Sequence, residues 1–194
     1  MLRGGTPETG AGPQEPSSAH LCKGHIPVAF VFSAPGEEEQ REGRPVAGDT
    51  GTNLESALVH LHSAQPALFP SRHRYDYRIT NAWPEPLAIA SGHRASEARD
   101  TEIREPRNVR RVLRELVGCN LVVLSGNKAR LLAHPLRESG RTVVEVPHVG
   151  NKGLNGTFKT PARLRLASSF ARREHRVQLW ATAVLRALAG EGVS

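Results

Sequence analysis

The sequence predicts an α/β domain of three layers, in which helices cover both faces of a central parallel sheet of about four strands. The first observation is that four short runs are apolar along their whole length, which is typical of strands buried on both faces. The second is that apolar residues recur at helical spacing in the segments between these runs. Strands that alternate with helices pair in parallel, because each helix returns the chain to the same end of the sheet.

The predicted strands are bounded by proline, glycine and polar residues, which favour turns. They lie at residues 26–33 (IPVAFVFS), 77–83 (YRITNAW), 120–126 (NLVVLSG) and 142–148 (TVVEVPH). The predicted helices between them lie at 53–62, 108–117 and 128–136. The last segment opens with Thr160-Pro161, which favours a helix start, and ends near Gly190. Its sequence fits either one helix or two helices that break near Ser168-Ser169.

The chain divides into a short tail and one domain of ordinary size. Residues 1–24 are half Gly, Pro, Ser and Thr, so they bury too little apolar surface to offset the entropy of ordering, and we expect a disordered tail. Residues 25–194 form the predicted α/β domain. No apolar run approaches the roughly 20 residues that a bilayer span needs, so the composition excludes a membrane-inserted protein.

The cysteine count limits the classes of protein further. Cys22 and Cys119 are too few for a disulfide scaffold or a four-cysteine zinc or iron–sulfur site. The first residues lack the apolar core of a secretion signal, so we expect a cytoplasmic protein. His20, Cys22 and His25 have a spacing that metal sites use, but no fourth ligand accompanies them. We therefore expect no metal and no cofactor.

The charge is distributed unevenly along the chain, whose formal net charge is +7. Residues 148–194 contain eight Lys or Arg against two Glu, whereas residues 31–60 contain two Arg against six Asp or Glu. A basic flank beside an acidic patch fits an enzyme that binds a polyanion with one part and reacts with it at the other. The alternative is a solvated, arginine-rich helix.

Polar loops follow three of the predicted strands, at residues 33–51, 80–84 and 147–156. The carboxyl ends of parallel strands meet at one edge of a sheet, and ligands of open α/β sheets bind there. We therefore expect the three loops to converge on one functional site.

The motifs in these loops occur in a fixed order along the chain. The first loop contains Ala34-Pro35-Gly36, Glu37-Glu38-Glu39, Gly43-Arg44-Pro45 and Gly48-Asp49-Thr50-Gly51. Later come Thr80-Asn81, Leu124-Ser125-Gly126, and His148 followed by Leu154-Asn155. In these motifs and their order, residues 26–190 resemble the uracil-DNA glycosylase superfamily.

The chain departs from the pattern of that superfamily at four points. Phe32-Ser33 stands where Gly-Glu often precedes the first motif, and the four iron–sulfur cysteines of one branch are absent. Val46 stands where an aromatic ring is common, and Val149-Gly150-Asn151-Lys152 replaces the usual Pro-Ser after the histidine. These departures fall at the base pocket and the DNA-gripping loop, so they affect the choice of substrate more than the type of reaction.

The resemblance implies a monofunctional DNA glycosylase, which hydrolyses the N-glycosidic bond of a base and leaves an abasic site. It implies that Glu39 orients water and offsets positive charge on the sugar, with Asp49 as the alternative acid. It also implies that His148 donates a hydrogen bond to the departing base, and that Asn81 pairs with the edge of a pyrimidine. The alternatives are a solvated glutamate loop and, for Asn81, a cap at the end of a strand.

The resemblance also implies a base pocket and a DNA-binding loop. The base-pocket residues are Ser33, Ala34, Pro35, Gly36, Val46 and Asp49. The DNA-binding residues are Asn151, Lys152, Leu154, Asn155 and Lys159. A base inside a duplex must flip out to react, and we expect an exposed Leu154 to fill the gap that it leaves. The alternative is a leucine that docks onto the core.

Val46 in place of a ring predicts a pocket enlarged for a bulky modified pyrimidine, such as the glucosylated hydroxymethylcytosine of some bacteriophage DNA. That substrate would give the protein a role in defence against phage. One alternative is a repair glycosylase for uracil or hypoxanthine, in which Phe32 or Trp83 stacks on the base. Another is a non-catalytic DNA-binding protein of the same fold. An α/β hydrolase that uses Ser33 or Ser125 is disfavoured, because neither serine lies in a nucleophile elbow. We expect DNA as the partner, no membrane contact and a monomer.

Overall fold

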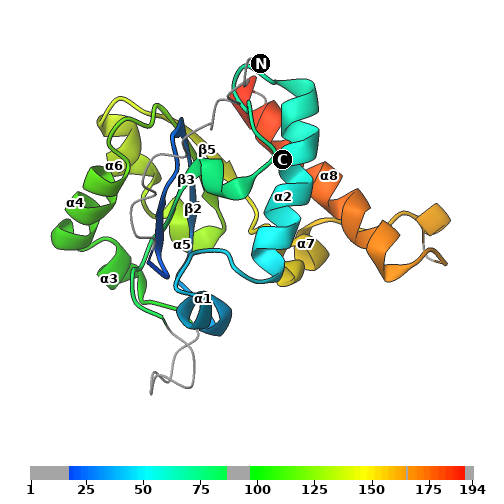
Figure 1. Ribbon diagram of the computed structural model, residues 1–194, viewed down its shortest axis with the longest axis horizontal. Helices are drawn as coiled ribbons and strands as arrows, with labels where there is room; N and C mark the ends of the chain where they lie inside the picture. Colours follow the sequence, from blue (N-terminus) through cyan, green and yellow to red (C-terminus); the bar gives the residue numbers. More distant parts are fainter. Residues whose placement is uncertain (1–17, 87–96, 165, 191–194) are drawn as a thin grey trace, which may run out of the picture.

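The centre of the structure is a sheet of five strands in the order β1-β3-β2-β4-β5. This computed structural model describes residues 18–86, 97–164 and 166–190 (Figure 1). The strands are β1 (Leu21–Lys23), β2 (Ile26–Phe32), β3 (Tyr77–Asn81), β4 (Leu121–Ser125) and β5 (Thr142–Val146). Strands β2 to β5 run parallel, and helices cover both faces of the sheet (Figure 1). The predicted α/β fold is confirmed, and its four parallel strands are the four predicted runs.

The edge strand β1 corrects the predicted boundary of the tail. It pairs antiparallel with β3, with Cys22 opposite Ile79, and the Cys22 side chain is buried. Composition missed this strand because three residues are too short to show a hydrophobic period. Residues 1–17 of the predicted tail lie outside the described residues.

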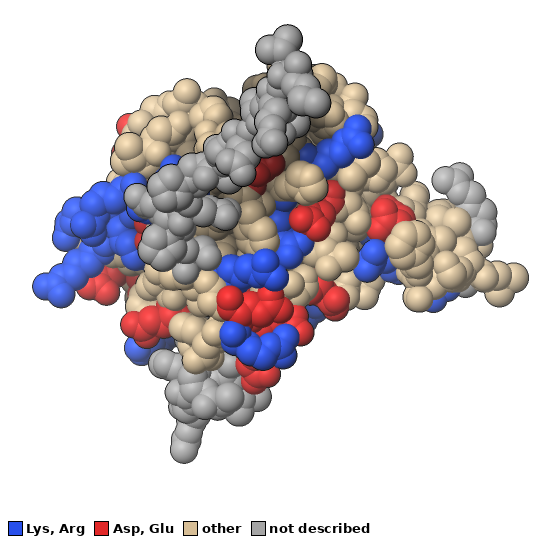
Figure 2. Space-filling model, in the orientation of Figure 1, with Lys and Arg blue, Asp and Glu red and all other residues tan. Residues whose placement is uncertain are grey.

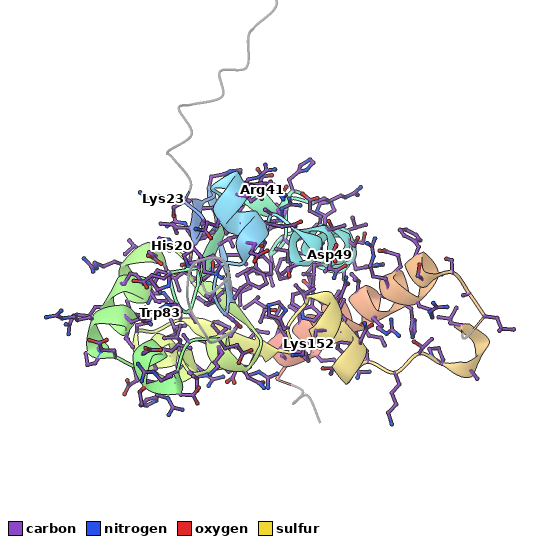
Figure 3. All side chains as sticks on the ribbon, turned by 90° about the horizontal axis from the view of Figure 1, so that it is seen from below. His20, Lys23, Arg41, Asp49, Trp83 and Lys152 are labelled. Atoms are coloured by element: carbon purple, nitrogen blue, oxygen red, sulfur yellow. The ribbon has the colours of Figure 1, made fainter. Side chains whose placement is uncertain are left out.

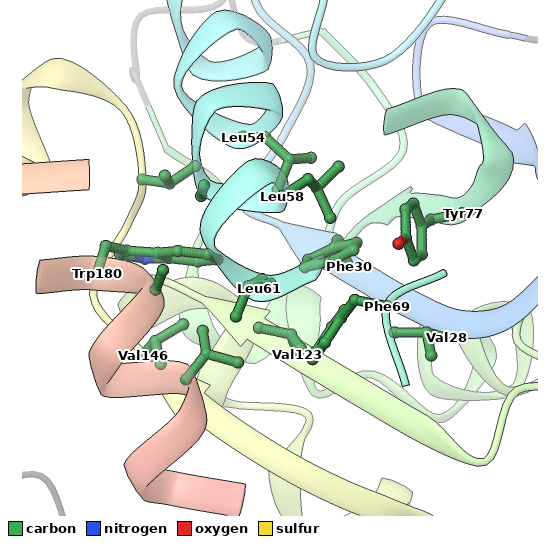
Figure 4. Close-up of a cluster of buried hydrophobic side chains, with 14 of the residues drawn as sticks. Val28, Phe30, Leu54, Leu58, Leu61, Phe69, Tyr77, Val123, Val146 and Trp180 are labelled. Carbon is green, nitrogen blue, oxygen red and sulfur yellow. The ribbon is translucent and has the colours of Figure 1, made fainter. Parts of the chain in front are cut away.

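Three helices lie on one face of the sheet: α2 (Asp49–Ala64), α7 (Asn151–Thr157) and α8 (Ser169–Leu188). Their apolar side chains meet those of the strands in the larger core, which Figure 4 shows. Trp180 of α8 is completely buried there, and its Nε1–H donates to the carbonyl oxygen of Pro147 at 2.7 Å. This bond fixes α8 to the loop that leaves β5.

The other face carries α3 (Asp100–Ile103), α4 (Pro106–Glu115), α5 (Asn127–Arg130) and α6 (Ala133–Glu138). The sequence predicted one helix at 128–136, but the structure divides it into α5 and α6. The division has a local cause, because Pro135 has no N–H to donate to the carbonyl group of Leu131. The helix therefore starts again at Ala133.

The last predicted segment is one α-helix that begins later than Thr160-Pro161. A 3-10 turn, Ala162–Leu164, follows the proline, and α8 begins at Ser169. Ser168 is its N-cap, and the Ser168 hydroxyl oxygen accepts a hydrogen bond from the Ala171 N–H at 3.1 Å. The serine pair at which the sequence suggested a break is therefore the start of α8.

The acidic patch predicted from residues 31–60 lies over α1 (Glu37–Glu42). Figure 2 shows acidic side chains gathered there, with basic side chains beside them. Arg44 and Glu42 form an ion pair in this patch, with 2.7 Å between Arg44 Nη2 and Glu42 Oε2. Within residues 18–86, 97–164 and 166–190, no helix combines the length and the apolar character that crossing a membrane requires.

Candidate functional site

The predicted loops converge at the carboxyl edge of the parallel strands. From β2 the chain passes to β3 on one side of the sheet, and from β4 it passes to β5 on the other. Strand order thus reverses between β2 and β4, which is the position where open α/β sheets bind ligands. Figure 3 looks onto this edge and shows Asp49 of α2 near Lys152 of α7.

Hydrogen bonds join the start of α2 to the start of α7. Asn151 Nδ2 donates to Asp49 Oδ2 at 2.8 Å. The completely buried Asn53 donates through Nδ2 to Asn151 Oδ1 at 3.0 Å and to the carbonyl oxygen of Val149 at 2.9 Å. These bonds fix the backbone on the carboxyl side of His148.

His148 is held as a neutral hydrogen-bond donor. The backbone N–H of Gly150 donates to His148 Nδ1 at 2.9 Å, so Nδ1 carries no proton and the proton of the neutral ring is on Nε2. Burial lowers the pKa of His148, and the negative charges of Glu97 and Glu39 oppose this effect without reversing it. At neutral pH the ring is therefore uncharged and offers Nε2–H to a ligand.

Close packing fixes the plane of the His148 ring. A Cβ atom at Gly126 would lie 3.1 Å from His148 Cβ, and one at Gly153 would lie 2.2 Å from the His148 carbonyl oxygen. The Phe32 ring packs edge to face against the imidazole, with 5.9 Å between the ring centroids. Ser125 supports the same loop, because its hydroxyl donates to the Pro147 carbonyl oxygen and accepts from the Val149 N–H.

Asn81 ends β3 directly beside Phe32 of β2. Its side chain is 4% exposed, and its Oδ1 atom is buried with no hydrogen-bond partner among the described residues. Leaving a buried acceptor unsatisfied costs about 1–3 kcal/mol, so a ligand group that donates to it would gain affinity. Among the described residues, no backbone group donates a hydrogen bond to Asn81 Oδ1.

Glu39 is the member of the Glu37-Glu38-Glu39 run that faces inward. Glu37 and Glu38 are exposed, whereas Glu39 is half-buried and its charge acts on His148. The Gly36 N–H donates to Glu39 Oε2 at 2.9 Å, which caps α1 and fixes the carboxylate. Within the described residues, Oε1 forms no hydrogen bond.

Val46 does not face an open pocket as the sequence predicted. Its side chain is 3% exposed and belongs to the larger hydrophobic core. It is also the only described residue other than glycine with a positive φ, 47°, which is an unfavourable conformation for a β-branched residue. The missing ring is therefore a feature of core packing.

Leu154 is not the exposed wedge that the sequence predicted. Its side chain is 1% exposed, because α7 turns it toward the core shared with α8. The alternative interpretation, a leucine docked onto the core, is confirmed. The other residues of this set, Asn151, Lys152, Asn155 and Lys159, are exposed.

The remaining base-pocket residues connect β2 to α1. The carbonyl oxygen of Ser33 accepts from the Trp83 N–H at 2.9 Å, which extends the pairing of β2 with β3 beyond the strands. Ala34 and Trp83 pack against the smaller core. Of the two rings considered for stacking, Phe32 therefore lies beside His148, whereas Trp83 contributes to the other face of the sheet.

Three supporting residues escaped sequence reasoning. Asn53 is a polar residue on the buried face of α2, and a polar residue among the apolar positions of a helix indicates a buried hydrogen bond. Ser125 belongs to a motif and lies outside a nucleophile elbow, and nothing local in the sequence indicates that it supports the histidine loop. Nothing in the sequence indicated that the charge of Glu97 acts on His148, because Glu97 follows residues 87–96, for which the sequence predicted no helix or strand.

His20 and Cys22, whose spacing with His25 resembles that of metal sites, make other contacts in the structure. His20 Nε2 lies 3.2 Å from Glu115 Oε1, and the Cys22 thiol donates to the Tyr75 carbonyl oxygen. The part of the chain that the structure describes contains no group of three or more His, Cys, Asp or Glu residues that could hold a metal ion.

The site thus combines a neutral donor, a fixed carboxylate and a buried amide at one end of the sheet. A flat, polar ligand with both donors and acceptors would satisfy this set, and the imidazole could stabilise negative charge that develops on it. No protein-family model and no curated protein matches this chain.

Proposed function

We propose that the protein is a monofunctional DNA glycosylase that removes a modified pyrimidine and leaves an abasic site. The observation that carries this proposal is the state of His148, whose Nδ1 accepts from Gly150 while burial keeps the ring neutral. A neutral Nε2–H group can donate a hydrogen bond to the negative charge that appears on a departing base, and the ring does not have to gain or lose a proton to do so. The proposal includes DNA as partner and a monomer in the cytoplasm.

The proposed reaction needs only water as a second reactant. Water adds to C1′ of the deoxyribose while the N-glycosidic bond breaks, and the electron pair of that bond passes to the base. His148 donates a hydrogen bond to the base oxygen that gains this charge. The ionised Glu39 offsets the positive charge of the oxocarbenium-like sugar and then accepts a proton from the water, and the departing base anion takes up one proton in turn.

Asn81 and Phe32 would position the base. The amide of Asn81 offers a donor and an acceptor together, which suits the edge of a pyrimidine, and its Oδ1 lacks any partner in the described residues. The Phe32 ring, which is 2% exposed, packs edge to face against the imidazole and so helps to hold it in place. Because Val46 belongs to the core, it does not indicate the size of the base, and activity on a series of substrates determines that size.

The test is incubation of the pure protein with single-stranded and duplex oligonucleotides that carry one modified base each. The series contains uracil, hypoxanthine, hydroxymethylcytosine and glucosylated hydroxymethylcytosine, and alkali reveals abasic sites as strand breaks. We expect strand breaks with at least one pyrimidine. His148→Ala should lower the single-turnover rate by about 10²- to 10³-fold, as does loss of one oxyanion-type donor.

His134→Ala is the matched control, because His134 is exposed on α6 and lies outside the site. It should leave the rate unchanged. If folded protein produces no abasic site in any substrate but still binds DNA, the glycosylase proposal is wrong and a non-catalytic DNA-binding protein is favoured.

A further inference from the structure

A groove of about 550 Å³ lies between α7 and the first turns of α8. The amino-terminal half of α8 extends past the sheet beside α7 (Figure 1). The residues that matter here are Asn151 and Asn155 of α7 and Phe170, Arg172, Arg173 and Arg176 of α8. The described lining of the groove includes no Asp or Glu, so the surface presents an excess of positive charge.

Two of the arginine charges are only weakly compensated within the protein. Arg176 donates to neutral acceptors, the carbonyl oxygen of Phe158 at 3.2 Å and the hydroxyl of Thr160. Arg173 Nη2 lies 3.4 Å from Glu174, a carboxylate that does not line the groove. Guanidinium groups that line one groove repel one another, and an anionic ligand with several charges would relieve this repulsion.

An exposed aromatic ring indicates which kind of polyanion fits. The Phe170 side chain is 63% exposed, and the Arg173 guanidinium lies over its ring at 5.2 Å. Aromatic rings beside arginines are the pattern with which proteins stack unpaired bases while the arginines contact phosphates. The base faces of a duplex are covered by their neighbours, so the ring favours a single strand.

The groove borders the loop that holds His148, through Asn151. Asn151 lines the groove and also bonds to Asp49, and it directly follows Gly150, which holds His148. Helix α7 has seven residues, which corresponds to a length of about 10 Å. One nucleic-acid strand can therefore reach from the active site into the groove.

We propose that the groove binds an unpaired segment of the DNA strand that carries the scissile base, with Phe170 stacking on a base and the three arginines contacting phosphates. That the bound strand is the one with the scissile base rests on the proposed glycosylase function. Leu154 is consistent with it, because a buried leucine cannot fill the gap that a flipped base leaves in a duplex. The expected consequence is a preference for single-stranded DNA.

The first test measures binding of fluorescein-labelled oligo(dT), which contains no base for excision, to the full chain by fluorescence anisotropy. We expect tighter binding of the single strand than of an oligo(dT)·oligo(dA) duplex of equal length. Phe170→Ala should weaken single-strand binding about tenfold, as loss of one stacked base does, and Phe170→Leu should weaken it similarly, because leucine has no π-face. Val117→Ala, at another exposed apolar residue, should bind like the wild type.

The second test concerns the arginines. Replacing Arg172, Arg173 and Arg176 by Gln should flatten the plot of log affinity against log salt, by roughly 0.7 for each single-strand phosphate that an arginine no longer neutralises. The matched control replaces Arg107, Arg110 and Arg114, which are exposed on α4, and changes the net charge equally. We expect a markedly smaller change in slope for this control.

These outcomes are separable from those of the excision assay, because oligo(dT) tests binding alone. The groove proposal is overturned if Phe170→Ala binds the single strand like the wild type, if it weakens duplex binding equally, or if both arginine triples lower the slope equally. Binding as expected without excision of any base would retain the groove and reject the glycosylase.

Discussion

The chemistry of His148 depends on contacts that leave its ring little freedom. Gly150 supplies the backbone N–H that fixes the tautomer, and Gly126 and Gly153 leave the space in which the residue fits. Burial then keeps the ring neutral by lowering its pKa. The sequence identified the histidine by its place after the fourth predicted strand, but its tautomer and charge follow from neighbours distant in sequence.

The lowered pKa of His148 predicts how stability depends on pH. Below the ordinary value of 6.5 the unfolded chain binds a proton at this histidine that the native state does not bind until lower pH. The free energy of unfolding should therefore fall as pH decreases below 6.5, until the folded-state pKa is passed. His148→Gln cannot titrate, so urea unfolding at pH 7.5 and 5.5 should show that the wild type loses more stability than this variant. An equal loss in both proteins would contradict the pKa direction.

Val46→Phe distinguishes a residue packed in the core from one that lines an enlarged pocket. A ring in an enlarged pocket would block a bulky base selectively, but a ring in the core overpacks it at a cost of about 1–3 kcal/mol. We expect a lower melting temperature and loss of activity on every substrate. Val59→Phe is the control, because Val59 is 43% exposed on α2. Unchanged stability with loss of one bulky substrate would restore the pocket interpretation.

At the scale of elements, the sequence predicted the helices and strands whose hydrophobic pattern is regular and long enough to distinguish a helix from a strand. β2 and α2 were found because their apolar patterns are long and bounded by turn residues. The break between α5 and α6 follows from Pro135, a readable signal that the periodicity obscured. Leu154 was misassigned because a Gly- and Asn-rich segment was interpreted as a loop, whereas it forms the short helix α7.

Helix α7 offers a matched pair of glycines for testing how tightly His148 is held. A Cβ at Gly153 would lie 2.2 Å from the carbonyl oxygen of His148, whereas one at Gly156 meets nothing within 4 Å. We expect Gly153→Ala to shift the histidine loop, lower the melting temperature and reduce any excision rate by more than tenfold. Gly156→Ala should instead stabilise the protein by about 0.4–1 kcal/mol, because alanine restricts the unfolded chain. Similar melting temperatures for the two variants would mean that the loop containing His148 can shift at little cost in stability.

At the scale of the whole molecule, a partly buried polar network joins elements that the sequence predicted separately. Glu115 of α4 accepts from the Thr80 hydroxyl of β3 at 2.6 Å and lies 2.5 Å from Arg111 Nη1. His20, just before β1, contacts the same carboxylate. Arg111 also donates to the carbonyl oxygen of Asn81 at 2.9 Å, so the network reaches the candidate site. Sequence reasoning could not find it, because its members are up to 95 positions apart and no local pattern connects them.

Removal of the Glu115 charge should therefore destabilise the whole domain. Glu115→Gln leaves the partly buried Arg111 without its carboxylate, which costs about 1.5–3 kcal/mol, as for a lost hydrogen bond to a charged group. Burial alone would raise the pKa of Glu115, but hydrogen bonds from His20 and Thr80 and the charge of Arg111 bring it below its ordinary value of 4.5. The stabilisation is thus complete above pH 4.5 and is lost as pH falls through the folded-state pKa.

The measurement is urea unfolding of wild type and Glu115→Gln at pH 7 and at successive values below 4.5. The difference in free energy of unfolding should be large at pH 7 and should shrink in acid, because the wild type loses its ionised carboxylate there. Glu138→Gln removes an exposed glutamate of α6 and should change little at any pH. If Glu115→Gln were as stable as Glu138→Gln at pH 7, the network would not be what joins β1, β3 and α4.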